Sequence, residues 1–209
     1  MRSPLKVFLL LLLITILAAG GWALWTYWGT NIVADGKRAD ALTALEQTWE
    51  GAPAAEKEAE LPLPTEGDPV WILEIPAIDL REPILAGISE EALNTGLAWY
   101  PTTALPGEVG NMGIAGRQLT NGEPFRRLLE LNEGDEVIIE SSIKRYSYEV
   151  RVAPRELTVQ ESDSWILEPV PGKDFDPHEA ILTLTTEQDL HPTSDRSVAF
   201  AVLVGEAEK

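Results

Sequence analysis

Cysteine is absent from the 209-residue sequence, and basic residues are scarce. Without a thiol the chain can form no disulfide framework, no Cys-ligated zinc site and no thiolate nucleophile. The sequence carries 16 Lys and Arg against 34 Asp and Glu, which gives a formal net charge of -18. Nucleic-acid binders concentrate Lys and Arg, so this balance argues against a phosphate-binding surface and a nucleic-acid partner. The length suits one ordinary domain with some chain to spare.

Charge is also missing from a long apolar run at residues 7–28. A helix of this length crosses a hydrocarbon core of about 30 Å. Arg2 and Lys6 precede the run, and aromatic residues crowd its far end (Trp22, Trp25, Tyr27 and Trp28). The positive-inside rule then places the N-terminus in the cytoplasm and the rest of the chain outside. We predict a cytoplasmic tail at 1–6 and a single transmembrane helix at 7–28 in the cell membrane. The alternative is a cleaved signal peptide, for which the run is long and lacks a polar mature start.

Residues 29–69 are predicted to form an extracellular stalk or linker. Within this segment Ala39, Leu42, Leu45 and Trp49 share one stripe of a short helix. The chain then becomes rich in Pro, Ala and Glu, a composition typical of a semi-extended spacer. Whether the helix packs on the following domain or continues the membrane helix stays open at this point.

Residues 70–209 show the pattern of an all-β domain, an antiparallel barrel or sandwich, because short strand-like runs alternate with Gly, Pro and Asn. Two short helices are expected beside the strands: one opened by Ser89 with Glu90 and Glu91 in its first turn, and one starting at Pro124. The candidate strands are WILEI (71–75), REPIL (81–85), MGIA (112–115), EVIIE (136–140), YSYEVRVA (146–153), ILTLT (181–185) and SVAFAVLV (197–204).

Several short motifs recur in a fixed order along this domain. They are Ile75-Pro76, Tyr100-Pro101, Thr103 to Gly107, Gly110-Asn111, Ala115-Gly116, Pro124-Phe125 with Leu128, Gly134-Asp135, and the run LTLTT that ends at Thr186. With this order and spacing, the chain from about Trp71 to Val204 resembles a sortase domain, especially of class E. The resemblance implies an eight-stranded β-barrel on a membrane anchor. It also implies a cysteine transpeptidase that cleaves a Leu-Pro-x-Thr-Gly or Leu-Ala-x-Thr-Gly sorting motif and transfers the acyl group to an amine of the cell wall or of a pilin.

The family's catalytic Cys, His and Arg are not all present. By the resemblance, the His position falls on Arg117, the Cys position on Glu187 and the Arg position on Arg196. A guanidinium stays protonated at physiological pH and cannot shuttle a proton as an imidazole does. Attack of a carboxylate on an amide would give an anhydride, with no group suited to protonate the leaving amine. These positions are therefore predicted to be inactive, although an unconventional, non-cysteine transpeptidase or hydrolase remains the alternative.

The replacements suggest a cluster of charges. We expect Glu187 to lie between Arg117 and Arg196 as a salt-bridge cluster that stabilises the former catalytic site. The alternative is that the three are unconnected polar residues on the floor of a groove, since partly exposed ion pairs often contribute little.

Other potential catalytic or metal-binding residues carry less weight. His191, Ser194 and Asp195 hold the components of a triad but lie too close in one loop to reach the required geometry. Five acidic residues carry the oxygen ligands that Ca²⁺ prefers, but their spacing is not that of an EF-hand (Asp174, Asp176, Glu179, Glu187 and Asp189). His178 is expected in a solvated loop, and Trp99 and Trp165 in the core or at its rim. No cofactor and no metal are predicted.

The sequence thus predicts a pseudoenzyme of the sortase family, acting by binding or scaffolding in the anchoring or assembly of surface proteins. Its expected partners are the membrane through the N-terminal helix and, on the outside, sorting-signal peptides, a pilin or an active sortase.

Overall fold

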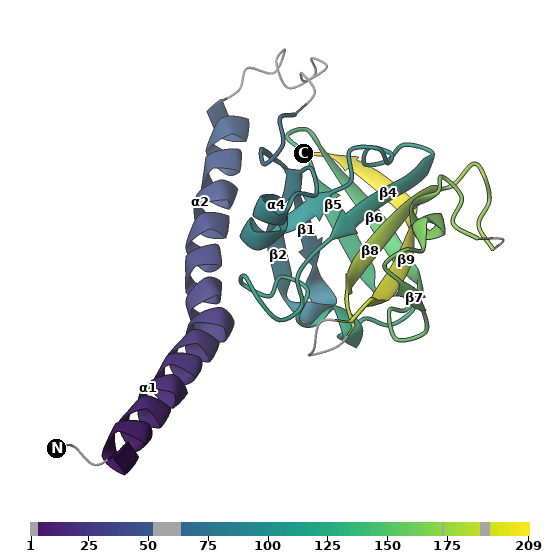
Figure 1. Cartoon of the computed structure of the whole chain (residues 1–209). Coiled ribbons are helices and arrows are strands. Elements are labelled where there is room, and N and C mark those ends of the chain that lie inside the picture. Colours follow the sequence, from purple (N-terminus) through teal and green to yellow (C-terminus); the bar gives the residue numbers. More distant parts are fainter. Residues whose placement is uncertain (1–3, 52–63, 173, 189–192) are drawn as a thin grey trace.

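Eight strands close into a barrel in the computed structural model, which describes residues 4–51, 64–172, 174–188 and 193–209 (Figure 1). Around the ring the strands follow the order β6-β5-β1-β2-β3-β4-β8-β9, and β9 pairs with β6 to close it. Their bounds are β1 (Pro69–Ile75), β2 (Leu80–Ala86), β3 (Leu97–Trp99), β4 (Gly110–Ala115), β5 (Glu136–Glu140), β6 (Lys144–Val152), β8 (Ala180–Glu187) and β9 (Asp195–Glu208). The predicted eight-stranded barrel is confirmed.

Two strand pairs in the ring are parallel, β2 with β3 and β4 with β8, and the others are antiparallel. All seven candidate runs form strands. Two strands were not predicted from the sequence: β3 and a ninth strand, β7 (Thr158–Gln160), which pairs with the start of β9 outside the ring. Both missed strands have only three residues, too few to show an alternating pattern.

The barrel interior holds the main hydrophobic core, to which every strand of the ring contributes. A second cluster covers the outer face of β8 and β9 and includes Val159, Ile166, Phe175, Ile181 and Phe200. Because β9 is covered on both faces, its run from Ser197 to Val202 is buried and almost entirely apolar. Trp99 and Trp165 pack into these two clusters, as the sequence predicted.

One of the two predicted short helices is present. Helix α4 (Glu90–Thr95) begins after Ser89, whose hydroxyl oxygen accepts a hydrogen bond from the backbone N–H of Ala92 at 3.3 Å. The prediction of a helix from Pro124 is wrong. Residues 124–127 form turns, and only a single 3-10 turn follows them, η3 (Leu128–Glu130). The buried residues Phe125, Leu128 and Leu131 are spaced by three. This spacing suits the 3-10 repeat of three residues per turn better than the α-helical repeat of 3.6.

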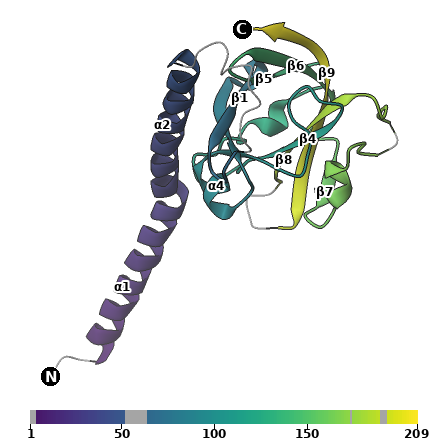
Figure 2. The ribbon, with the colours of Figure 1, turned by 90° about the horizontal axis from the view of Figure 1, so that it is seen from above.

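The N-terminal part is one long helical path. Helix α1 (Pro4–Leu24) is long and apolar enough to cross a membrane and buries none of its residues against the rest of the protein. A π-helical turn, η1 (Trp25–Gly29), joins it to α2 (Thr30–Gly51). In Figures 1 and 2, α1 extends away from the barrel while α2 runs alongside it.

Helix α2 therefore both continues α1 and packs on the barrel, which answers the question that the sequence left open. Its buried face consists of Ala34, Arg38 and Leu45. Leu42 and Trp49 are partly buried on the same side, whereas Ala39, which the sequence analysis placed in the stripe, is exposed. The predicted stalk at 29–69 thus begins as a docked helix, and its Pro- and Glu-rich residues 52–63 lie outside the described residues.

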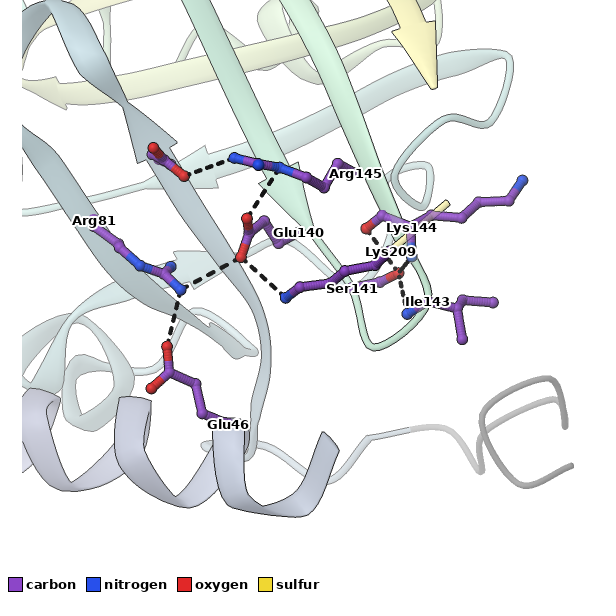
Figure 3. Close-up of polar contacts among 9 residues, drawn as sticks. Glu46, Arg81, Glu140, Ser141, Ile143, Lys144, Arg145 and Lys209 are labelled. Carbon is purple, nitrogen blue, oxygen red and sulfur yellow. Dashed lines mark hydrogen bonds and ion pairs between the residues drawn. The ribbon is translucent and has the colours of Figure 1, made fainter. Parts of the chain in front are cut away.

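A buried carboxylate ties the far end of α2 to the barrel (Figure 3). Glu140, only 4% exposed, lies 3.0 Å from Arg145, 3.2 Å from Lys209 and 3.4 Å from Arg81 in ion-pair contacts. Arg81 also reaches Glu46 of α2 at 2.9 Å. Next to this cluster, the Lys209 ammonium lies 4.6 Å from the centre of the Trp49 ring. Charge pairing and a cation–π contact thus fix α2 at the end remote from α1.

Candidate functional site

The strand order brings the three predicted site residues to one end of the barrel. Strands β4 and β8 are parallel neighbours, with Ala115 opposite Thr185, so their carboxyl ends meet at the same edge. Arg117 follows β4 by two residues, and Glu187 ends β8. In the antiparallel pair of β8 with β9, Glu187 lies directly opposite Arg196.

Backbone contacts fix the position of Arg117. The N–H of Gly116 donates to the carbonyl of Thr185 at 3.2 Å, and the buried Thr186 hydroxyl donates to the carbonyl of Gly116 at 2.9 Å. A Cβ atom on Gly116 would lie 2.7 Å from both Leu97 and Phe125, so only glycine allows this close approach. On the other side, the N–H of Phe125 donates to the carbonyl of Arg117 at 3.0 Å. The guanidinium therefore extends from a firmly held backbone.

Arg117 and Glu187 form an ion pair. The Nη1 atom of Arg117 donates to Oε1 of Glu187 at 2.8 Å, and the two side chains are 25% and 31% exposed. A second, long contact of 3.5 Å joins Nη2 of Arg117 to Oδ1 of Asn94. The buried Nε of Arg117 has no hydrogen-bond partner within the described residues. The pair is thus a single charge-assisted hydrogen bond in a partly desolvated position, and the bidentate form is not reached.

Arg196 points elsewhere, so the predicted cluster is wrong for this residue. Its Nη2 pairs with Oε2 of Glu161 at 3.1 Å, and its Nη1 donates to the carbonyls of Thr193 at 2.8 Å and Asp195 at 3.1 Å. Strand β7 pairs with the other edge of β9, with Val159 opposite Arg196, and brings Glu161 within reach. Strand β7 was not predicted from the sequence, so this partner of Arg196 was not predicted either.

A tyrosine lies next to these charges. Burial raises the pKa of the Tyr100 phenol; the nearby Arg196 guanidinium opposes this rise and Glu161 adds to it. The Tyr100 ring also lies 3.1 Å from the position that a Cβ on Gly113 would occupy. A phenol with a raised pKa stays protonated at physiological pH, so Tyr100 can donate a hydrogen bond but cannot act as a base. Tyr100 was noted in the sequence only as part of the Tyr100-Pro101 motif, and Asn94 was not singled out, so only their contacts place them beside the site.

The described members of the alternative triad are engaged in other contacts. The Ser194 hydroxyl donates to Oε1 of Gln160 at 2.6 Å, and Oδ1 of Asp195 accepts from Nε2 of the same glutamine at 2.5 Å. His191 lies outside the described residues, so the triad geometry stays untested.

The described acidic residues that could act as calcium ligands do not form one cluster. Glu179 accepts two hydrogen bonds from Arg151, at 2.8 and 3.0 Å, and Glu187 is held by Arg117. Asp189 lies outside the described residues. In the part of the chain that the structure describes, no three His, Asp or Glu side chains gather closely enough to hold a metal ion. His178 is exposed in its loop, as predicted.

Comparison with known proteins agrees with the fold. A sortase-domain family model matches residues 73–204. Sortase SrtE1 of Streptomyces coelicolor is 29% identical over 188 residues, which cover 86% of this chain and 51% of that protein. The chain spans about half the length, or less, of the curated relatives that it matches.

Solved structures resemble the chain over most of their own length. The crystal structure of sortase E1 from Streptomyces coelicolor with a tripeptide in the active site is 30% identical, with a TM-score of 0.63, over 68% of this chain and 91% of that one. A sortase D5 transpeptidase of Clostridium perfringens is 25% identical, with a TM-score of 0.70, over 81% of this chain and 99% of that one. With a family model that covers well over half of its residues and a barrel that these structures share, the chain belongs to the sortase family and resembles the class E sortases.

Proposed function

We propose that this protein is a membrane-anchored pseudo-sortase, which binds a sorting-signal peptide without cleaving it. The observation that carries the proposal is the ion pair of Arg117 with Glu187 at the ends of β4 and β8. The resemblance to sortases assigns the His position to Arg117 and the Cys position to Glu187. In a sequence without cysteine, an ion pair stands where the nucleophile and its base would be needed.

The chemistry of this pair supports binding over catalysis. Oε1 of Glu187 accepts a charge-assisted hydrogen bond at 2.8 Å, which stabilises the carboxylate and makes it a weaker nucleophile. Arg117 is permanently protonated and cannot act as a base. General acid–base catalysis typically contributes ~10²–10⁴ in rate, and this contribution is lost with the imidazole.

The site nevertheless retains groups that suit a peptide. The Tyr100 phenol, protonated at physiological pH, is a donor for a carbonyl oxygen, and the Arg196 side chain is 21% exposed. The related sortase E1 structure holds a tripeptide in its active site. A short extended segment is accordingly the occupant that we propose, with a sorting motif as its sequence.

The location follows from α1. We propose that α1 anchors the protein in the cell membrane as a single span, with Arg2 and Lys6 on the cytoplasmic side and the barrel outside. In this position the barrel would present a sorting-signal peptide or a pilin to an active sortase, or occupy an assembly in the cell envelope.

The test uses the full chain in detergent micelles with labelled peptides of the Leu-Ala-x-Thr-Gly and Leu-Pro-x-Thr-Gly types and an amine acceptor. We expect saturable peptide binding by fluorescence anisotropy and no cleaved or ligated product by mass spectrometry. Turnover that is abolished by E187Q and kept by the control E161Q would establish a non-cysteine enzyme instead. Absence of binding would contradict the peptide-binding role.

The double variant R117H/E187C tests the assignment of the two positions in the same experiment. If they are the His and Cys positions, the introduced thiol should react with iodoacetamide at neutral pH faster in R117H/E187C than in R117A/E187C, which has no cation at position 117, because an adjacent imidazolium lowers the pKa of a thiol. Equal rates would contradict the assignment.

A further inference from the structure

Three consecutive residues near the site have left-handed backbone conformations. In the loop between β4 and β5, Asn121, Gly122 and Glu123 have φ values of 54°, 80° and 50°. Only glycine adopts such values freely, and runs of left-handed residues are rare for residues that carry a Cβ. Such a turn persists only when contacts from its surroundings hold it.

The holding contacts come from α2. Oδ1 of Asn31 accepts a hydrogen bond from the N–H of Gly122 at 2.9 Å, and Nδ2 of Asn31 donates to Oε1 of Glu123 at 2.7 Å. Two turns further along α2, the buried Arg38 lies against Gly122, where a Cβ would come within 2.7 Å of its Cζ. Arg38 is itself fixed by an ion pair with Glu82 of β2 at 3.2 Å.

The same turn is connected to the candidate site. Nδ2 of Asn121 donates to Oδ1 of Asn94 at 2.8 Å, and this oxygen also lies at 3.5 Å from Nη2 of Arg117. Where the loop returns, the N–H of Phe125 donates to the carbonyl of Arg117. The loop that begins with Arg117 is therefore closed at Phe125, and its tip is held by α2.

We infer that Asn31 of the juxtamembrane helix α2 is a positioning residue for the candidate site: it holds the left-handed turn 121–123 and, through it, the loop that carries Arg117. Asn31 lies three residues after Trp28, at the end of the predicted membrane span. A partner or lipid surface that shifts the start of α2 would therefore change the freedom of the site loop. The inference rests on the proposed function only for the use of the site as a peptide-binding site.

Amide exchange of phenylalanine tests this coupling without any ligand. The chain has four Phe residues, so the full-length protein labelled with ¹⁵N-Phe in detergent micelles gives four backbone amide signals. Phe125 reports the closure of the site loop and is not bonded to Asn31, whereas the buried Phe200 in β9 reports global opening. In N31A we expect the amide of Phe125 to exchange about tenfold faster, the factor that one or two hydrogen bonds provide. Phe200 should not change.

Variants that swap the hydrogen-bond donor and acceptor between positions 31 and 123 separate a positioning role of Asn31 from a general loss of folding. N31D replaces the donated bond by two facing carboxylates and should accelerate Phe125 as N31A does. The double variant N31D/E123Q reverses donor and acceptor and should restore slow exchange. E123Q keeps an acceptor for Asn31 but loses the ion pair of Glu123 with Arg126, so the double variant is compared with E123Q. Q47A changes an exposed residue of the same helix and should behave as the wild type.

Unchanged exchange of Phe125 in N31A would overturn the inference. The inference would also be overturned if N31D/E123Q did not restore slow exchange of the Phe125 amide. This second criterion still applies if N31A destabilises the whole fold and accelerates the exchange of every amide. The amide-exchange experiment uses no peptide. If the protein binds no sorting peptide, that result contradicts only the proposed function, and the exchange rates still test the role of Asn31.

Discussion

The contribution of the Arg117–Glu187 pair to stability can be measured with a double-mutant cycle of R117A, E187A and the double variant. Two unit charges about 4 Å apart attract each other by ~1 kcal/mol in water and ~4 kcal/mol at an effective dielectric constant near 20. With side chains 25% and 31% exposed, the pair lies between these limits.

Two costs reduce this attraction. Holding the long Arg117 side chain in one geometry opposes the pair, and the buried Nε without a partner in the described residues adds a desolvation cost of ~1–3 kcal/mol. We therefore expect a coupling energy of about 1 kcal/mol. This is more than a typical exposed pair contributes, and less than the 3–5 kcal/mol typical for removing one partner of a fully buried pair.

Urea unfolding of the full chain in detergent micelles, followed by tryptophan fluorescence, provides the assay. Trp71 and Trp99 pack edge to face at 5.0 Å on the barrel and report its unfolding. The matched control is a second cycle on Arg196 and Glu161, where Glu161 is 69% exposed and a coupling below about 0.5 kcal/mol is expected. A coupling for Arg117 and Glu187 that is indistinguishable from the control would refute the reasoning.

Two further predictions concern groups away from the site. Burial raises the pKa of Tyr148 to about 12, although the Gly107 N–H that donates to its hydroxyl lowers it. Because the folded pKa exceeds the ordinary value of 10, the contribution of Tyr148 to stability is complete below about pH 10. This contribution, roughly 2–3 kcal/mol, is lost between about pH 10 and 12. The urea midpoint of the wild type should therefore fall more over this range than that of Y148F. E140Q should lower the free energy of unfolding by about 2–3 kcal/mol, because Arg81, Arg145 and Lys209 lose their ion-pair contacts with a carboxylate that is only 4% exposed. The loss stays moderate because these three cations are partly exposed and can reach water. A change below about 0.5 kcal/mol in the urea experiment would contradict that account.

The sequence predicted what depends on strand pattern and missed what depends on short or non-periodic contacts. The seven runs found by alternation all form strands, and the parallel order of β4 and β8 brings Arg117 to Glu187 as the resemblance implied. The actual partner of Arg196 follows a three-residue strand, which carries too little pattern to recognise.

The docking of α2 was also beyond the sequence. Its buried face contains Arg38, a residue that hydrophobic periodicity counts as exposed, and the pattern selected Ala39 in its place. Arg38 is buried because Asp35, three residues earlier, and Glu82 pair with it and Gly122 leaves room for its guanidinium. Glu82 and Gly122 are distant in sequence, and no local rule pairs them with α2.

The continuous path from α1 through α2 has a mechanical consequence. At about 1.5 Å per residue these helices form roughly 70 Å of rod, and α2 is fixed to the barrel near both of its ends, by Asn31 and by the contacts of Glu46 and Trp49. A barrel on a flexible tether samples a volume set by the tether length. Here, with α1 in a bilayer, the helices set both the height of the barrel above the membrane and its orientation. Rotation of α1 about its axis therefore turns the candidate site by the same angle. Partners that diffuse in the same membrane would then meet the candidate site at one constant height above the bilayer.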